Sequence, residues 1–380
     1  MKISIIGGGP AGLYFAILMK KSNAAHQIKV YERNGPDDTF GWGVVFSGET
    51  LTNLAKADAE SHAEITKAFE AWDNVDVVHR DEKISIHGNS FSGIARLQLL
   101  KILQQRCKEL GVKLLFRKEV SDIEALRQSC DLLVATDGVN STVRREYSTH
   151  FGPDLDDRPN RYIWYGTNRL FHGLTLTFRE NKAGVFVAHS YKFNKTTSTF
   201  IVECDPQTWD AGRFAAMSDD QTCAYLEKVF EADLDGEPLL SNKSNWINFV
   251  LVKNERWFFE NLVMLGDALH TAHFSIGSGT KLALEDAIAL HQCFETTEEI
   301  GNALSKFEFT RKPVIKEYQA AALDSMRWFE NARDYMKFSP IELAYALMKR
   351  SGRVDDEDLR RRDPVFMSRY YRQKAEGRTQ

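Results

Sequence analysis

A run of three glycines after the first apolar segment constrains the fold more than any other feature of this chain. KISIIGGG is a short β-branched run ending in glycine, AGLYFAILMKK has the length and composition of a helix, and IKVYE is a second strand. A strand, a tight turn, a helix and a second strand form a βαβ unit, which requires a parallel sheet. The N-terminal part is therefore predicted to be an α/β domain.

The glycine turn also matches the G-x-G-x-x-G pattern of dinucleotide-binding proteins. Gly7 permits the tight turn, Gly9 lets a pyrophosphate approach the backbone, and Gly12 lets the helix pack on the sheet. The helix begins around Pro10 and Ala11, and its free N–H groups and positive dipole end suit phosphate. The turn is predicted to bind a dinucleotide, and the alternative is a glycine-rich turn without a ligand.

An acidic residue stands where the ribose of such a ligand would lie. Glu32 follows Gly12 by twenty residues, at the end of IKVYE, where a carboxylate can accept hydrogen bonds from ribose hydroxyls. The neighbouring Arg33 either packs on the adenine or is solvated. This motif alone leaves open which dinucleotide binds.

The predicted type of secondary structure changes twice along the rest of the chain. RLQLLKILQQRCKEL from residue 96 is predicted to be a helix, and GVKLLF and CDLLVATDG are predicted strands. RYIWYGT, LTLTFRE, GVFVAHSYKF and STFIVECD, from about residue 161, predict an antiparallel sheet, and DQTCAYLEKVFEADL predicts a helix. NLVMLGD is predicted to be another strand of the parallel sheet. Residues 280–350 are predicted to be mostly helical, and the charged tail is expected to wrap the surface or fray.

The predicted fold class is α/β (α+β), with a Rossmann-like dinucleotide-binding domain, an inserted antiparallel-sheet domain and C-terminal helices. The expected boundaries place the first part of the binding domain at 1–160, with a small inserted segment at about 41–95. The antiparallel-sheet domain is expected at 161–255, the second part of the binding domain at 256–300, and the helices and charged tail at 301–380.

Composition excludes several classes of function. Domains that bind nucleic acids are usually basic, so the net charge of −4 argues against a nucleic-acid partner. The five cysteines are scattered without C-x-x-C, so neither a disulfide framework nor a metal site is expected. Because no apolar run has transmembrane length and glycines interrupt the N-terminal one, we expect a soluble cytoplasmic protein without a membrane partner.

Two further motifs narrow the ligand. DGVNSTVR at 137–144 follows the strand LLVAT, and Gly266-Asp267 follows another apolar strand and opens GDALH. G-x-G-x-x-G, D-G-x-N-S-x-V-R and G-D-A-x-H in this order resemble the single-component flavin-dependent aromatic hydroxylases, which have the p-hydroxybenzoate hydroxylase fold. The resemblance runs over most of the chain and implies FAD as the dinucleotide.

A subgroup of that family is a closer match. The segments PDDTFGWGVVFS, RYIWYGT, STFIVE, AHFSIGSGTKLALEDA and the tail motif LRRRDP resemble salicylyl-CoA 5-hydroxylases and anthraniloyl-CoA monooxygenases. The violacein-pathway tryptophan hydroxylase is a more distant match. Anthraniloyl-CoA monooxygenases typically carry an additional old-yellow-enzyme domain, and none is expected from these 380 residues, so salicylyl-CoA is the first expectation.

The resemblance assigns roles around the cofactor. It implies that Asp267 binds a ribityl hydroxyl, the alternative being a helix N-cap, and that Arg96 contacts FAD. The Gly277–Thr280 loop would lie along the isoalloxazine, although Phe274-Ser275 and Lys281 replace the proline and asparagine common in the broader family. Gly43 and Val44 would pass close to the flavin. The expected cofactor-binding residues are Gly7, Gly9, Pro10, Ala11, Gly12, Glu32, Arg33, Gly43, Val44, Arg96, Asp137, Gly138, Gly266, Asp267, Gly277, Gly279 and Thr280.

The implied reaction is hydroxylation of an aromatic acyl-CoA, with salicylyl-CoA giving gentisyl-CoA. The sequence has no second dinucleotide motif, and the resemblance implies that NAD(P)H binds transiently and reduces the flavin, with Arg144 a candidate on its path. O2 would then form a flavin C4a-hydroperoxide that an electron-rich ring attacks. The cofactor carries this chemistry, so neither a metal nor a nucleophilic triad is expected.

Substrate-side residues are less constrained by the sequence. His189, Tyr165 and His273 are the candidates for hydrogen bonding or deprotonating a phenol, with Tyr191 and His270 as neighbours, and each histidine could instead be structural. The basic residues that could meet CoA phosphates are Arg311, Lys312, Arg333 and Arg360–Arg362, although DDED beside RRR also suits self-pairing.

Three other functions stay open from the sequence. The substrate could be tryptophan or another indole or aniline, the enzyme could be a flavin reductase or dehydrogenase, or the chain could be a non-enzymatic FAD-binding module. The intact flavin loop and the aromatic middle sheet argue against the last. The sequence does not decide between a monomer and a homodimer.

Overall fold

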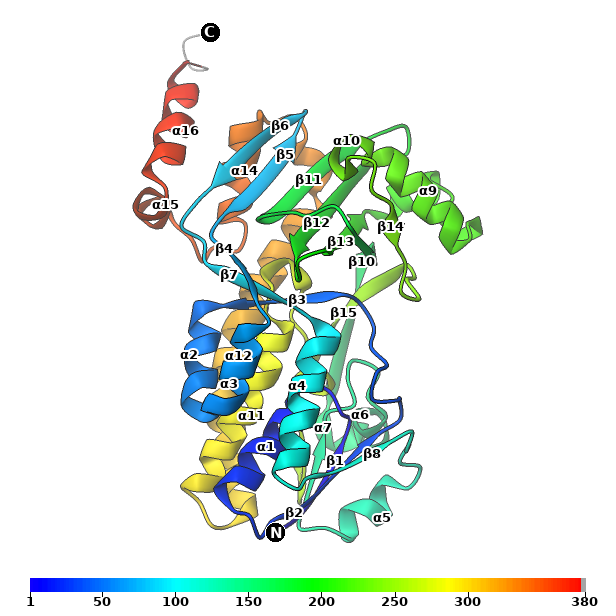
Figure 1. The fold of residues 1–380 in the computed structure, drawn as a ribbon, viewed down its shortest axis with the longest axis vertical. Helices are drawn as coiled ribbons and strands as arrows, with labels where there is room; N and C mark the ends of the chain where they lie inside the picture. Colours follow the sequence, from blue (N-terminus) through cyan, green and yellow to red (C-terminus); the bar gives the residue numbers. More distant parts are fainter. Residues whose placement is uncertain (377–380) are drawn as a thin grey trace.

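The computed structural model describes residues 1–376 and has two halves along its long axis (Figure 1). The half that holds the N-terminus is built on the parallel sheet, and the other half is built on the antiparallel sheet. The strands β10 (Pro153–Thr167) and β15 (Ile247–Asn254) pair along their length and run from one half into the other. This arrangement confirms the predicted fold class.

The parallel sheet has the order β16-β17-β9-β1-β2-β8, and all its pairings are parallel except that of β16. The helix α1 (Pro10–Ser22) follows β1 directly, so the predicted βαβ unit is confirmed. Its residues 11–19 are all buried, because α4 and α11 pack against it. The strands are β1 (Lys2–Ile6), β2 (Gln27–Glu32), β8 (Lys113–Phe116), β9 (Leu132–Ala135), β16 (Phe258–Phe259) and β17 (Leu262–Met264).

The second sheet has the order β14-β10-β13-β12-β11-β5-β6, with β15 also on β10. Its middle strands are antiparallel, as predicted, but the earlier segment adds β5 and β6 to one edge, and β5 runs parallel to β11. A sequence pattern does not reveal this pairing because the partners are about a hundred residues apart. The further strands are β5 (Val75–His79), β6 (Glu82–Ile86), β11 (Leu174–Glu180), β12 (Val185–Lys192), β13 (Ser198–Cys204) and β14 (Leu239–Leu240).

A small sheet, β3-β7-β4, lies between the halves (Figure 1). It is made of β3 (Gly43–Ser47), β4 (Glu70–Trp72) and β7 (Phe91–Ala95). The next helix, α4 (Arg96–Glu109), starts directly after β7, which places Arg96 at the junction of the halves. Residues 41–95 therefore contribute to both the small sheet and the second sheet.

Helices complete both halves. The longest are α11 (Gly279–Glu295) and α12 (Ile300–Glu330), which pack together, as the helical pattern of residues 280–350 predicts. The others are α2 (Gly48–Ala57), α3 (Ala59–Lys67), α5 (Ile123–Gln128), α6 (Thr142–Glu146), α7 (Ser148–Phe151), α8 (Pro206–Ala211), α9 (Asp219–Val229), α10 (Glu231–Leu234), α13 (Ala332–Tyr335), α14 (Pro340–Lys349), α15 (Asp356–Arg362) and α16 (Pro364–Glu376).

Up to residue 376, the charged tail is more ordered than expected, and residues 377–380 lie outside the described part. It forms α15 and α16, because Asp355 caps α15 through a capping box and Tyr370 stacks on Tyr345 with ring centroids 3.9 Å apart. Of the expected domain boundaries, the one after residue 160 lies inside β10, and the one after 300 lies at the start of α12. Within residues 1–376, no helix is long and apolar enough to cross a membrane.

A buried ion pair fixes the helices around α1. The carboxylate of Asp58 has no exposed surface, and it accepts from Arg106 Nε at 3.2 Å and from Lys21 Nζ at 2.9 Å. It also caps α3 through the backbone N–H of Ser61. Burial alone raises the pKa of Asp58, but the hydrogen bonds from Arg106, Ser61 and Lys21 outweigh it and hold the pKa below its usual range.

Replacing Asp58 with Asn should lower the free energy of unfolding at pH 7 by about 3 kcal/mol, because the change leaves Arg106 without its buried partner. A carboxyl whose pKa is depressed by folding stabilises the protein above its unfolded pKa of about 4 and stops doing so as the pH falls below it. Urea unfolding at several pH values would measure this. A difference between D58N and wild type that did not shrink on acidification would contradict the role of the charge.

Candidate active site

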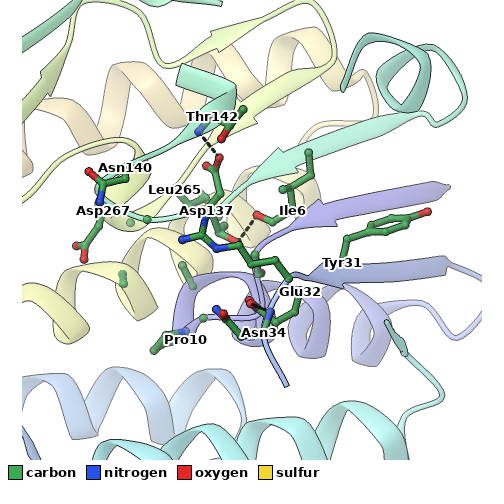
Figure 2. A pocket seen from close by; sticks show the side chains of 18 of the residues that line it. Ile6, Pro10, Tyr31, Glu32, Asn34, Asp137, Asn140, Thr142, Leu265 and Asp267 are labelled. Atoms are coloured by element: carbon green, nitrogen blue, oxygen red, sulfur yellow. Dashed lines mark hydrogen bonds between the residues drawn. The ribbon is translucent and has the colours of Figure 1, made fainter. Parts of the chain in front are cut away.

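A cleft with a volume of about 260 Å³ opens at the carboxyl ends of β1, β9 and β17. Ligands of open α/β sheets bind at this edge. Figure 2 shows that side chains from all three motifs face the cleft, among them Pro10, Asp137 and Asp267. The predicted cofactor residues that line it are Gly7, Gly9, Pro10, Ala11, Glu32, Arg33, Arg96, Asp137, Gly138, Gly266, Asp267, Gly279 and Thr280.

The glycines of the turn meet three different demands. Gly7 has φ +105°, and a Cβ there would lie 2.3 Å from the carbonyl oxygen of Thr136. A Cβ on Gly12 would lie 2.4 Å from the carbonyl oxygen of Gly7, so Gly12 packs beneath the cleft and does not line it. Gly9 has open space where a Cβ would be, on the cleft side, and caps α1 without a side-chain bond. The first turn of α1 therefore presents free N–H groups to the cleft.

Glu32 reinforces this turn from the end of β2. Its Oε2 accepts from the backbone N–H of Gly8 at 2.7 Å, and its Oε1 accepts from that of Asn34 at 2.8 Å. The carboxylate still lines the cleft (Figure 2), and Arg33 is another of the lining residues. A carboxylate can accept up to about four hydrogen bonds, so capacity is left for ribose hydroxyls.

The second motif is bound to the third through its arginine. Asp137 accepts from the backbone N–H of Thr142 at 2.8 Å and so holds the start of α6. The guanidinium of Arg144 is buried and donates to the carbonyl oxygen of Ala268 at 2.8 Å. This contact fixes the loop that carries Asp267. The geometry gives Arg144 a structural task.

A buried donor without a partner points to an acidic or carbonyl-rich ligand. The Nε of Arg96 lies in the cleft wall and has no hydrogen-bond partner among the described residues. Desolvation lowers the pKa of Arg96, and the nearby carboxylate of Asp267 opposes this effect. A buried guanidinium N–H that lacks a partner is costly, so a ligand with acceptor atoms would stabilise this site.

The loop before α11 offers a second helix terminus. Gly277 has φ +62°, which suits glycine, and the chain then enters α11 at Gly279. No acidic residue stands in the first turn of α11, and its N-cap, Ser278, makes no side-chain cap. Gly279 and Thr280 line the cleft, so the positive end of the helix dipole faces it.

Three predicted cofactor residues lie outside the cleft wall, in addition to Gly12. Gly277 is an exposed residue of the loop before α11, and Gly43 and Val44 are buried in β3. Gly43 donates its N–H to Thr199 Oγ1 at 3.0 Å and accepts from Tyr191 Oη at 2.8 Å, which ties β3 to the second sheet. Cleft residues that the prediction missed are Ile6, Tyr31, Asn34, Phe40, Lys118, Glu119, Val120, Ile123, Thr136, Asn140, Thr142, Leu265 and Ala283.

The predicted substrate-side residues fall on two faces of the second sheet. His189 and His273 meet on the face toward α12, where the rings of both contact Phe274. Tyr165 lies on the other face, and its hydroxyl donates to Asp219 at 2.8 Å. The structure does not bring Tyr165 together with the histidines. His270 lies elsewhere, with its Nε2 2.8 Å from Asp286.

The basic residues suggested for CoA phosphates are also dispersed. Arg311 is buried and donates to Asp286 at 2.9 Å, and Arg333 lies 3.1 Å from Asp205. Lys312 donates to the carbonyl of Glu255. Arg360–Arg362 lie on α15, where Arg361 pairs with Asp358 as the self-pairing alternative predicts.

Comparison with known proteins identifies the class. Residues 1–316 match the family of FAD binding domains, and the chain belongs to this family. It is 38% identical to a salicyloyl-CoA 5-hydroxylase of Streptomyces, over 97% of this chain and 73% of the relative. It is 34% identical to the 3-hydroxy-4-methyl-anthranilyl-[aryl-carrier protein] 5-monooxygenase of Streptosporangium sibiricum, over 94% and 97% of the two chains. Protodeoxyviolaceinate monooxygenase of Chromobacterium violaceum is 34% identical, over 90% and 92%.

Solved structures support the same fold. PqsL of Pseudomonas aeruginosa has a TM-score of 0.68 at 18% identity, covering 88% of this chain and 98% of PqsL. A tetrameric form of 2-methyl-3-hydroxypyridine-5-carboxylic acid oxygenase has a TM-score of 0.67 at 18% identity, covering 95% and 97%.

The cleft and these relatives together define an FAD-dependent aromatic monooxygenase. The pyrophosphate and flavin of FAD fit three features of the cleft: the glycine turn, the unpartnered Nε of Arg96 and the two helix N-termini. NAD(P)H and O2 are the typical co-substrates of this family.

Alanine substitutions should separate the roles of two glycines. Gly9→Ala has room in the protein and an ordinary backbone conformation (φ −79°), so the fold should persist. Its methyl group would occupy the approach of the pyrophosphate, and FAD affinity should fall at least about tenfold. Gly7→Ala should instead destabilise the apoprotein, since it clashes with Thr136. FAD titration and thermal unfolding of the apoproteins would measure both. Normal FAD affinity in G9A would contradict the assignment.

Proposed function

We propose that this protein hydroxylates an aromatic acyl thioester, with salicylyl-CoA converted to gentisyl-CoA as the first choice. The observation that carries this proposal is the similarity, over nearly the whole chain, to two relatives whose names give ring position 5 of an aryl group on CoA or on an aryl-carrier protein. Position 5 is para to the hydroxyl of a salicyl group and to the amino group of an anthranilyl group. Such a substituent makes that carbon electron-rich.

The described residues suit this reaction in two ways. Bound FAD would supply an electrophilic oxygen atom after reduction by NAD(P)H and reaction with O2. The positive end of α11, at Gly279 and Thr280, would stabilise negative charge on the reduced flavin. Tyr162 packs on Phe274 with ring centroids 4.7 Å apart, so the second sheet lies directly against the loop that precedes α11. An aryl ring held by this sheet would meet the flavin there.

A carrier-protein thioester is the second candidate substrate. It is favoured by the relative that acts on an aryl group attached to an aryl-carrier protein. CoA and carrier proteins are both thioester carriers, and the cleft geometry alone does not separate them. A free indole substrate would be a third reading, consistent with the similarity to protodeoxyviolaceinate monooxygenase.

The test is a product analysis with labelled oxygen. Purified holoenzyme would be mixed with NADH or NADPH and ¹⁸O2, and offered salicylyl-CoA, anthraniloyl-CoA, salicylyl on an aryl-carrier protein, free salicylate or tryptophan. We expect one labelled oxygen atom at ring position 5 of salicylyl-CoA and no label in free salicylate. A matched reaction with benzoyl-CoA, which lacks the activating hydroxyl, should give no product.

The other outcomes assign the alternatives. Label only in the carrier-bound substrate would move the substrate from CoA to a carrier protein. Label only in tryptophan would contradict the thioester proposal. NAD(P)H consumption that gives hydrogen peroxide with every compound would also contradict it.

A further inference from the structure

A carboxylate–histidine pair lies on the face of the second sheet toward α12. His189 on β12 and Glu203 on β13 are 4% and 1% exposed, and Nε2 of the histidine lies 3.2 Å from Oε2 of the glutamate. The other oxygen, Oε1, accepts from Asn160 Nδ2 at 2.8 Å. The sequence prediction included His189 but not Glu203 or Asn160.

This arrangement fixes the chemical state of the pair. Burial alone raises the pKa of Glu203, but the hydrogen bonds from His189 and Asn160 and the neighbouring His273 outweigh burial and lower it. The carboxylate oxygen needs a donor, which assigns a proton to Nε2 of His189, and in the neutral ring the lone pair is then at Nδ1. Among residues 1–376, no protein group hydrogen-bonds Nδ1. A histidine whose Nε2 is held by a carboxylate and whose Nδ1 has no partner is arranged as an oriented general base.

The pair lies against the loop expected beside the flavin. The ring of His189 meets the edge of Phe274 with centroids 5.2 Å apart, and it packs on Phe329 of α12 at 4.7 Å. Phe274 begins the short helix η3 (Phe274–Ile276), which leads into Gly277 and α11. The pair therefore stands at the boundary between the sheet and the flavin loop.

The neighbouring histidine, His273, is held by a different hydrogen-bond network. Nδ1 of His273 is 2.8 Å from Ser275 Oγ, which is 2.8 Å from Ser325 Oγ, and Arg350 Nε donates to Ser325 Oγ. Burial lowers the pKa of His273 to about 4, so it is neutral at pH 7. This network ties the flavin loop to the C-terminal helices. The other charged groups that act on His273 are Arg350 and Arg158, and Arg158 is paired with Glu330 at 2.7 Å.

We propose that His189 is the general base that takes the phenolic proton of the aryl substrate, and that Glu203, held by Asn160, is the residue that positions it. The substrate O–H bond breaks, the proton moves to Nδ1, and the electron pair stays on the phenolate oxygen. The phenolate raises electron density at the para carbon, where the new C–O bond would form with the distal oxygen that bound FAD supplies from O2, as the O–O bond breaks. The para proton would go to the oxygen atom left on the cofactor as the ring regains aromaticity, and the imidazolium returns its proton to the phenolate oxygen. This inference rests on the proposed function, since it requires a phenolic substrate.

The test follows ionisation of the bound substrate apart from turnover. Salicylyl-CoA is titrated into oxidised holoenzyme between pH 6 and 9, and the absorbance of its phenolate is recorded for wild type, H189Q, E203Q and E203D. We expect the apparent pKa of the bound phenol to rise by at least about one unit in E203Q and H189Q, and less in E203D. Single-turnover hydroxylation should slow by about 10²- to 10⁴-fold in H189Q, with KM changed only a few-fold.

Two controls separate loss of the base from loss of the fold. Binding of 2-methoxybenzoyl-CoA, which has no phenolic proton, should be the same in E203Q as in wild type. The variant H172N changes an exposed histidine of the same half and should behave as wild type.

Each outcome bears on a different claim. Unchanged phenol ionisation and hydroxylation in H189Q would overturn the inference while the proposed function stands. A defect in H189Q with none in E203Q would overturn the positioning role of Glu203. If wild type neither binds nor hydroxylates salicylyl-CoA, the proposed function fails and this inference fails with it.

Discussion

Hydrogen bonds between the ends of β1, β9 and β17 hold the whole cofactor cleft together. Thr136, just after β9, donates from Oγ1 to the carbonyl oxygen of Gly7 at 2.8 Å, so the glycine turn depends on a neighbouring strand. Arg144 binds the carbonyl oxygen of Ala268, and Asp286 of α11 accepts from the backbone N–H of Gly266 at 3.1 Å. The three motifs are far apart in sequence, yet these hydrogen bonds join the glycine turn to the end of β9 and the second motif to the third. These bonds fix the backbone at the edge of the cleft.

The same chain joins that cleft to a second half with a different task. The pair β10–β15 runs through both halves, and β3 is attached to the second sheet through Gly43. One half offers glycine turns and helix N-termini, which suit phosphates and a charged ring. The other offers an aromatic face with one carboxylate–histidine pair, which suits an aryl group. Contacts of Phe274 with Tyr162 and His189 bring the two surfaces together.

The parts that the sequence predicted well depend on local chemistry. Gly7 and Gly12 have conformations or close contacts that only glycine tolerates, and such demands leave a recognisable pattern. Thr136 and Glu203 were missed because their roles arise from strand register, which a single sequence does not reveal. Tyr165 shows the same limit. Alternation along β10 predicts that Tyr162 and Tyr165 lie on opposite faces of the sheet, but this pattern does not show which face contacts the flavin loop. The parallel pairing of β5 with β11 was likewise invisible, since it joins distant segments.

The most direct test of this account is a crystal structure of the holoenzyme with an aryl-CoA bound. The account predicts the FAD pyrophosphate at the first turn of α1, the flavin ring beside Gly279 and Thr280, and the aryl group between that ring and the sheet face that bears His189. A flavin ring remote from α11, or an aryl group on the Tyr165 face of the sheet, would contradict it.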